Sequence, residues 1–451
     1  MSTNAHTPER IPRGVGDPGV AIGGTTLVKG LGVAFALAVT VGGMVGQGIL
    51  RTPGIVAGAV PHPTLILVMW TVVGLLCILD ACAHVEMAAA TPRAGGPYAF
   101  ADRSFGPVGG TITGWADALN NIGAIGFLAV VSAEFVQRIG PMAGAPISVL
   151  APAIVLAFLG VNLIGTRVGG ASQTLGSLLK VLALIAIIGL LVSSSPAERG
   201  PADGLPPALT FGALVIALRA IRTTYDGWNS ATYFCEEMPN PGRDLPRTVF
   251  GGIVLVTATY VAINAALLHA MSPAEMAASN LPVAEAMRSL LGDGAEQVTS
   301  IFAAISALAV TNLFVMFCSR TAFGMARDGV LPRALSVVSG DGAPRRALLA
   351  VALPGAALAA SGSYQTLLAL TVPAALVVNI LVNLAALRLR RTEPDLPRPF
   401  RTPLFPLPII FSTLISLALL IALAVETPGI TLGFLAVIGV AALARILTLR
   451  R

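Results

Sequence analysis

The chain has 451 residues, of which 55% are hydrophobic and only 11% are charged, and its mean hydropathy is +0.82. Apolar stretches of about 20 residues, the length that crosses a bilayer, recur along the whole sequence. This pattern excludes a soluble domain of any size and predicts an all-α polytopic membrane protein. The net charge of +6 is then explained by basic loops on one side of the membrane rather than by a nucleic-acid partner.

In chain order, residues 1–25 combine acids and prolines with no apolar segment, which predicts a disordered cytoplasmic tail rather than a signal peptide. Residues 26–451 are expected to form one membrane domain, in which hydropathy and helix-breaking residues predict twelve spans. The expected spans are 31–59, 64–90, 107–137, 146–166, 173–194, 208–237, 245–271, 297–325, 346–361, 364–388, 407–425 and 429–447. Arginine clusters fall on the loops that an even number of spans leaves inside, so both termini are expected on the cytoplasmic side of the inner membrane.

Residue types that commonly build catalytic or metal sites are present but scattered. The four cysteines lie in or beside apolar spans, at spacings that suit neither a disulfide framework nor a zinc site. The four histidines offer no ligand pair at helical spacing, and the absence of a phosphate-binding P-loop argues against an ATP-driven pump. We therefore expect no catalytic residue, no metal, no cofactor and no disulfide-linked partner.

The first expected span contains VGGMVGQGIL at residues 41–50, where four of the ten positions are glycine and one is glutamine. Glycine costs roughly 1 kcal/mol per position inside a helix, and a backbone group left unpaired in lipid costs several times more. Such a segment indicates a break that contacts a polar ligand, although close helix packing through small residues is the alternative. Free N–H groups of the outer half-helix suit a carboxylate, and freed carbonyls of the inner half suit an ammonium; an α-amino acid carries both.

A second polar interruption lies in the sixth span, from Thr223 to Gly227. Spans 1 and 6 occupy corresponding positions if residues 31–194 and 208–388 are two five-span repeats, which are inverted because five is odd. Residues 407–447 then add two helices. Paired interrupted segments in the two halves are the best sequence indication of a transporter's binding site.

Five longer motifs follow one another in the chain: VGGMVGQGILRTPG, PRAGGPYAFADRSFGP, YDGWNSATYFCEEMPNPGRDLPR, CSRTAFGMARDGVLPR and LPRPFRTPLFPLP. In this order they resemble the broken first helix, the loop after span 2, span 6, span 8 and the loop after span 10 of the amino acid, polyamine and organocation transporter superfamily. The third motif is closest to its L-type amino-acid transporter branch. The resemblance covers about residues 30–410 and implies a leucine-transporter-type fold with helices 1 and 6 broken.

The resemblance also implies where a substrate binds. The implied substrate-binding residues are Met44, Val45, Gly46, Gln47, Gly48, Thr223, Tyr225, Asp226 and Gly227. The glycines around Gln47 form the carboxylate cradle, and the carbonyls of Met44, Thr223 and Asp226 bind the ammonium. Gln47 stands where the family has a small hydroxyl residue or alanine, and Thr223 replaces the aromatic gate of the L-type branch, so the identity of the substrate is left open.

Lys180 is a lone lysine in the apolar fifth span. An ammonium there costs about 2.5–3.5 kcal/mol on insertion scales, so it is expected to face the bundle interior and a polar partner; the alternative is that it reaches to the interface. It resembles the lysine that occupies the place of a bound sodium ion in sodium-independent members and braces span 5 against spans 1 and 8. Thr311 and Asn312 are its expected neighbours, with interhelical hydrogen bonding as their alternative role.

Charged and aromatic residues flank the second break. Arg222 and Asp226 are four residues apart, which suits an ion pair on a continuous helix. We expect them to compensate each other's charge in a vestibule, with contact to a substrate side chain as the alternative. Trp228 is expected to line the vestibule or to pack in the core. Glu237 resembles a hinge and gate anchor of the family rather than a proton carrier.

Together these features predict a sodium-independent secondary transporter, a permease or exchanger, that moves amino acids across the lipid bilayer by alternating access. A compensated pair of Arg222 and Asp226 leaves a neutral polar pocket, which favours small or medium neutral amino acids. A free Asp226 favours a cationic amino acid or a polyamine. Exchange and proton coupling both stay open. A polytopic membrane enzyme is the alternative of another class, but the chain shows no converging nucleophile and base.

Overall fold

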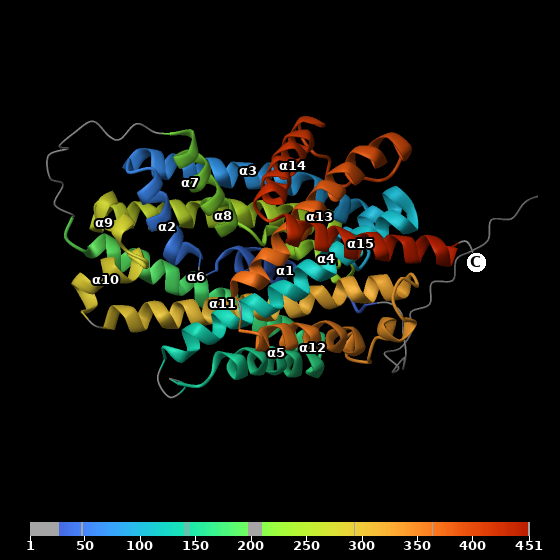
Figure 1. The fold of residues 1–451 in the computed structure, drawn as a ribbon, viewed down its shortest axis with the longest axis horizontal. Coiled ribbons are helices and arrows are strands. Elements are labelled where there is room, and N and C mark those ends of the chain that lie inside the picture. Colours follow the sequence, from blue (N-terminus) through green and yellow to red (C-terminus); the bar gives the residue numbers. More distant parts are fainter. Residues whose placement is uncertain are drawn as a thin grey trace, which may run out of the picture.

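The computed structural model describes residues 27–449 apart from residues 47, 140, 141, 143, 197–209, 293 and 363. The expected tail, residues 1–25, lies outside the described residues. Regular structure in the described part is almost entirely helical (Figure 1), which confirms the predicted fold class. The helices are α1 (Val33–Met44), α2 (Gly48–Ala59), α3 (Pro63–Ala90), α4 (Pro97–Gln137), α5 (Ile147–Ile164), α6 (Thr166–Ser193), α7 (Phe211–Thr224), η2 (Trp228–Glu237), α8 (Pro241–Ala270), α9 (Pro273–Ala278), α10 (Pro282–Leu291), α11 (Gly294–Arg327), η3 (Arg333–Ser336), α12 (Arg345–Ala360), α13 (Tyr364–Thr392), α14 (Leu407–Glu426) and α15 (Pro428–Leu449).

Every predicted span coincides with a helix or with a pair of consecutive helices. Nine helices of the described chain are long and apolar enough to cross a membrane, and α1 with α2, bent by 43° at their junction, makes a tenth. α7 and α12 have only 14 and 16 residues, fewer than a full crossing needs. The count of twelve spans therefore stays a prediction.

The third span differs most from its predicted bounds, because α4 begins at Pro97 and not at residue 107. Gly106 has a φ of 77°, a conformation that glycine adopts without the steric cost that other residues meet. Pro107, which follows it, cannot donate a backbone hydrogen bond. These two residues kink the helix, and the predicted start of the span marks this kink.

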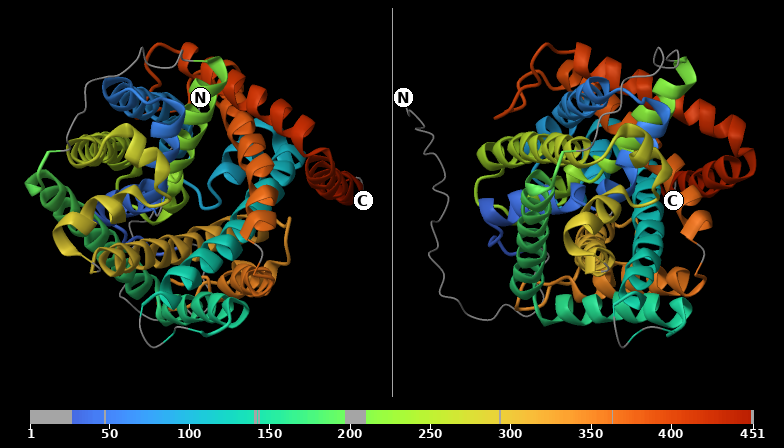
Figure 2. Two further views of the ribbon diagram at one scale, coloured as in Figure 1. Left: turned by 60° about the vertical axis from the view of Figure 1, so that its left-hand side comes forward. Right: turned by 90° about the vertical axis from the view of Figure 1, so that its left-hand side faces the viewer.

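The first broken helix lies in the interior of the bundle. α1 packs against α6, α8, α11 and η2, and α2 packs against α7 and α9 (Figure 1). α14 and α15 lie at the periphery, against α3, α4 and α13 (Figure 2). In the most apolar part of α11 78% of the residues are buried, against 17% in α15. α15 therefore presents most of its apolar surface to lipid, whereas α11 forms part of the protein core.

Candidate functional site

The two interrupted helices meet at Gly43 and Gly227, whose backbones are in direct contact. A Cβ atom on Gly43 would lie 2.7 Å from the carbonyl oxygen of Gly227, and a Cβ on Gly227 would lie 2.6 Å from the carbonyl oxygen of Gly43. Gly227 also has a φ of 101°, which favours glycine. Only glycine at both positions allows this approach, so the glycine-rich pattern serves contact between the two breaks as well as the bend.

The carbonyl groups that the break frees at the end of α1 have specific partners. Lys180, which is fully buried, donates from Nζ to the carbonyl of Gly42 at 2.5 Å and to that of Val45 at 2.9 Å. The hydroxyl of Ser306 on α11 donates to the same Val45 carbonyl at 3.0 Å. Lys180 therefore faces the bundle interior, and together with Ser306 it joins α1, α6 and α11 at the break.

Tyr260 on α8 connects the end of α1, in the first broken span, to the end of α7, in the sixth. This role was not predicted from the sequence. Its hydroxyl lies 2.8 Å from the carbonyl oxygen of Met44 and 3.2 Å from that of Thr224. A hydroxyl has one proton, so it donates to one of the two at a time. The Met44 carbonyl, predicted to bind an ammonium, therefore keeps one lone pair for a second donor. The sequence feature that could have identified Tyr260 is a tyrosine in an apolar span, since a buried hydroxyl needs a hydrogen-bond partner.

The backbone of the first break leaves room for a side-chain atom at Gly46. Gly46 is half-buried, and a Cβ there would have only the Met44 carbonyl oxygen, at 4.0 Å, within reach. Gly48 begins α2, and a Cβ on it would lie 3.3 Å from the side chain of Thr224. Thr224 in turn hydrogen-bonds to Thr52 at 2.7 Å. The cradle glycines thus lie between open space and the end of α7; Gln47 lies outside the described residues.

The second break presents one exposed face. Thr223 and Asp226 are exposed, and the Asp226 amide donates to the Thr223 carbonyl at 3.4 Å. One carboxylate oxygen of Asp226 accepts the Gly227 amide at 2.9 Å. Tyr225 is fully buried, and its hydroxyl donates to the Trp70 carbonyl at 3.0 Å. Tyr225 therefore packs against α3, and its predicted contact with substrate stays a prediction.

The predicted ion pair between Arg222 and Asp226 is wrong, because Arg222 pairs with Asp80 on α3. α7 ends at Thr224, so the four-residue spacing no longer brings the two side chains over one another. Asp80 is almost fully buried. The signal that could have identified it is a carboxylate in an apolar span, which is rarely tolerated without a partner.

Thr311 and Asn312 hydrogen-bond to neighbouring helices and not to Lys180 in the described part of the chain, so their expected place beside that lysine stays a prediction. The Thr311 hydroxyl lies 3.2 Å from that of Ser132 on α4. Asn312 accepts a hydrogen bond from Asn162 on α5 at 2.8 Å and donates to Gln173 on α6 at 3.2 Å. These contacts agree with the alternative role of Thr311 and Asn312, which is interhelical hydrogen bonding. Both residues lie more than one helical turn beyond Ser306 along α11.

The inner half of the sixth span, η2, is held by one buried and one half-buried ion pair. Glu237 accepts from Arg320 on α11 at 2.8 and 2.9 Å, and both side chains are at most 2% exposed. Glu236 pairs with Arg327 at 2.9 Å and accepts the Ala94 amide at 2.6 Å. These contacts join η2 to α11 and to the segment before α4. They support the predicted anchoring position of Glu237, whose part in gating stays a prediction.

Trp228 begins η2 and is 7% exposed. The edge of its ring packs against the ring of His84 on α3, with the centroids 4.9 Å apart. Of the two predicted environments, core packing therefore describes this side chain. α3 thus contacts both sides of the second break, through Asp80 before it and His84 after it.

Comparison with known proteins agrees with this arrangement. A family model described as Amino acid permease matches residues 31–443. The b(0,+)-type amino acid transporter 1 of Mus musculus is 28% identical over 419 residues, which cover 90% of this chain and 84% of that protein. Large neutral amino acids transporter small subunit 2 of Mus musculus is 31% identical over 412 residues (86% and 75%). The serine/threonine exchanger SteT of Bacillus subtilis is 28% identical over 310 residues (68% and 70%).

A solved structure has the same fold. It is a transporter of the nucleobase-cation-symport-1 family in a closed conformation with bromovinylhydantoin bound. It matches with a TM-score of 0.58 over 95% of this chain and 94% of its own, at 16% identity, so the likeness concerns the fold alone. The family match includes both breaks and every helix that contacts them. The chain therefore belongs to the amino acid permease family, near the L-type branch of its superfamily.

Proposed function

We propose that this permease is a secondary transporter that moves amino acids across the membrane by alternating access. The observation that carries the proposal is the contact of the two broken helices at Gly43 and Gly227 with open space beside Gly46. The relatives named above are amino acid transporters and an exchanger. A substrate there would meet both kinds of backbone group that a zwitterion needs.

The substrate's two charged ends would be bound by different half-helices. Its carboxylate would accept from the free N–H groups at the start of α2, near Gly46 and Gly48, where the helix dipole is positive. Its ammonium would donate to the remaining lone pair of the Met44 carbonyl and to carbonyls at the end of α7. Because backbone groups bind the carboxylate and the ammonium, other residues must select the side chain of the substrate.

Alternating access then requires contacts that can separate. The ion pairs of Glu236 and Glu237 hold the inner half of the sixth span against α11. Arginine clusters lie on the loops at this same end of the predicted spans, so we place this end, with both termini, on the cytoplasmic side of the inner membrane. Opening toward the cytoplasm would move η2 away from α11 and break these pairs.

Glycine substitutions test the position of the site. Gly46→Ala adds a methyl group to open space, so it should lower the apparent affinity for amino acids about tenfold or more while leaving protein yield and melting temperature near the wild-type values. Gly43→Ala forces a Cβ against the Gly227 carbonyl and should reduce stability as well as transport. Binding would be measured by scintillation proximity with a labelled amino acid. Unchanged affinity in Gly46→Ala would place the substrate elsewhere.

The class of side chain depends on Asp226. Charge compensation by Arg222 was the reason to expect small neutral amino acids, and Arg222 instead pairs with Asp80. Asp226 is an exposed residue at the second break, and this position favours the second candidate, a cationic amino acid or polyamine. Neutral amino acids remain the first candidate, since two of the relatives carry neutral substrates in their names.

Counterflow into proteoliposomes decides between the candidates. Unlabelled neutral, basic and acidic amino acids would compete against the best labelled substrate in the wild type and in Asp226→Asn, with Glu285→Gln, a distant exposed carboxylate, as the control. If Asp226 binds a cationic side chain of the substrate, transport by Asp226→Asn should no longer be inhibited by arginine and lysine. Serine and threonine should still compete. An identical profile in both forms would show that Asp226 does not face the substrate. Chemical turnover of the amino acid by the purified protein would favour a membrane enzyme instead.

A further inference from the structure

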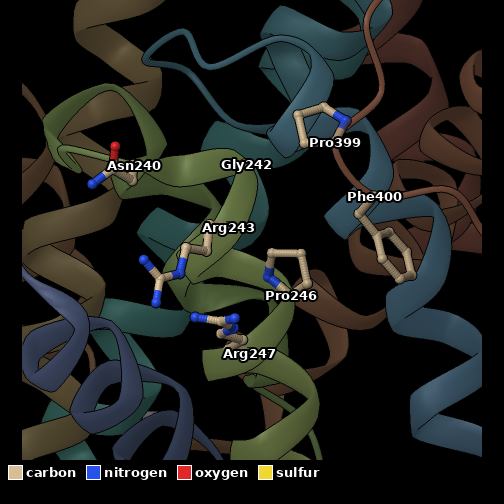
Figure 3. A pocket seen from close by; sticks show the side chains of 7 residues that line it. All are labelled: Asn240, Gly242, Arg243, Pro246, Arg247, Pro399 and Phe400. Carbon is tan, nitrogen blue, oxygen red and sulfur yellow. The ribbon is translucent and has the colours of Figure 1, made fainter.

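A hollow of about 560 Å³ lies at the start of α8, far from the two breaks along this helix. One wall is the loop that precedes α14: Pro399 packs on Gly242, and the rings of Phe400 and Phe250 lie 5.1 Å apart. The other wall carries Arg243 and Arg247. In Figure 3 both arginines extend from the same side of α8, and Pro246 lies between them and Phe400.

These two arginines differ from several others at this end of the protein. Arg320, Arg327 and Arg390 are held by buried or half-buried carboxylates. Arg243 and Arg247 are exposed, and no carboxylate of the described residues forms an ion pair with either. One turn apart on one helix face, they present two unneutralised charges and up to ten N–H donors to whatever fills the hollow.

The same face of α8 continues as an apolar, outward-facing stripe. Gly251, Val254, Leu255 and Ala258 follow the arginines at helical spacing, and all are exposed. A Cβ on Gly251 would meet nothing within 4 Å, so the stripe has a shallow groove directly beyond the arginines. In a membrane this face contacts acyl chains, and the arginines then lie at headgroup depth.

We propose that Arg243, Arg247 and the hollow beside Phe400 form a binding site for an anionic phospholipid of the cytoplasmic leaflet. The two guanidinium groups hold the phosphate, which arginine binds in bidentate geometry. One acyl chain lies along Gly251 and Val254. Charge complementarity selects an anionic headgroup over a zwitterionic one, and the continuous apolar stripe selects a lipid over a soluble phosphate. The site is separate from the breaks and does not depend on which amino acid is carried.

The test measures lipid binding by the full-length protein in detergent, by native mass spectrometry and by lipid-induced change in melting temperature. The probes are dioleoyl phosphatidylglycerol, dioleoyl phosphatidylcholine and inorganic phosphate. Wild-type protein should prefer phosphatidylglycerol. Arg243→Gln with Arg247→Gln should reduce that preference by roughly 30-fold, which corresponds to about 1 kcal/mol for each arginine. Arg333→Gln with Arg391→Gln removes the same charge from exposed positions at this end and should leave the preference nearly unchanged.

A second variant tests the acyl-chain groove without altering charge. Gly251→Phe fills open space, so it should keep the lipid-free melting temperature and still weaken phosphatidylglycerol binding. If both double variants lost the preference for phosphatidylglycerol equally, the preference would come from general surface charge, and the proposal would be overturned. Stabilisation by millimolar phosphate alone, lost in the Arg243 and Arg247 variant, would assign the site to a soluble anion and overturn the lipid. Wild-type affinity in Gly251→Phe would contradict the proposed path of the chain.

Discussion

Replacing Lys180 by alanine is expected to reduce amino-acid uptake by at least about tenfold in sodium-free medium. The substitution removes two hydrogen bonds from an ammonium to the carbonyls of Gly42 and Val45. Hydrogen bonds to a charged group contribute about 1.5–3 kcal/mol each, and tenfold corresponds to about 1.4 kcal/mol. The end of α1 would then be tied to α6 less firmly, which disturbs the equilibrium between the two access states. Uptake into proteoliposomes, normalised to the amount of protein inserted, measures the effect.

The sodium dependence of uptake provides a control for this prediction. Without the lysine, the carbonyls of Gly42 and Val45 and the hydroxyl of Ser306 face a space lined by oxygen, the ligand type that hard cations prefer. Sodium should therefore restore part of the uptake in Lys180→Ala and none in Lys180→Ala with Ser306→Ala. Amino-acid uptake by the wild type should not change when sodium is added or removed. Wild-type uptake that rises steeply with sodium at fixed pH and potential would contradict the role assigned to Lys180.

Breaking the buried ion pair of Arg320 and Glu237 should cause the largest loss of stability. Arg320→Met leaves the Glu237 carboxylate buried without its partner, and removing one member of such a pair costs about 3–5 kcal/mol. The two side chains are 2% and 0% exposed, so water cannot replace the guanidinium. The melting temperature of the purified protein in detergent should fall markedly, and expression should fall with it.

The double variant separates charge from packing. Arg320→Met with Glu237→Gln leaves no unpaired charge, so it should recover much of the stability that the single variant loses. Arg345→Met breaks a solvent-exposed pair with Asp341 and should change stability by no more than about 1 kcal/mol. A double variant as unstable as Arg320→Met would mean that the arginine acts through its other contacts and not through the ion pair. Those contacts are the Phe234 ring, 5.0 Å away, the Met316 carbonyl and the Ser319 hydroxyl.

Hydropathy and glycine content were sufficient to predict the long helices and the first break, whereas α9 and α10 fall between two predicted spans. Both signals are local: about 20 apolar residues suffice to cross a bilayer, and dense glycine weakens a helix wherever it lies. For this reason the predicted first span, 31–59, contains α1 and α2 and the gap between them. Lys180 was also predicted to face the interior, because a charge in an apolar span costs too much when it faces lipid.

Only the tertiary structure decided which groups meet. Spacing along the chain favoured Asp226 as the partner of Arg222, whereas the helix ends before Asp226 and Asp80 comes from another helix. Likewise Ser306, not Thr311 or Asn312, shares a carbonyl with Lys180. Residues on different helices can form an ion pair or hydrogen bond only when helix rotation and depth bring them within about 3 Å. Those two quantities depend on packing among all the helices, and no short segment of the sequence determines them.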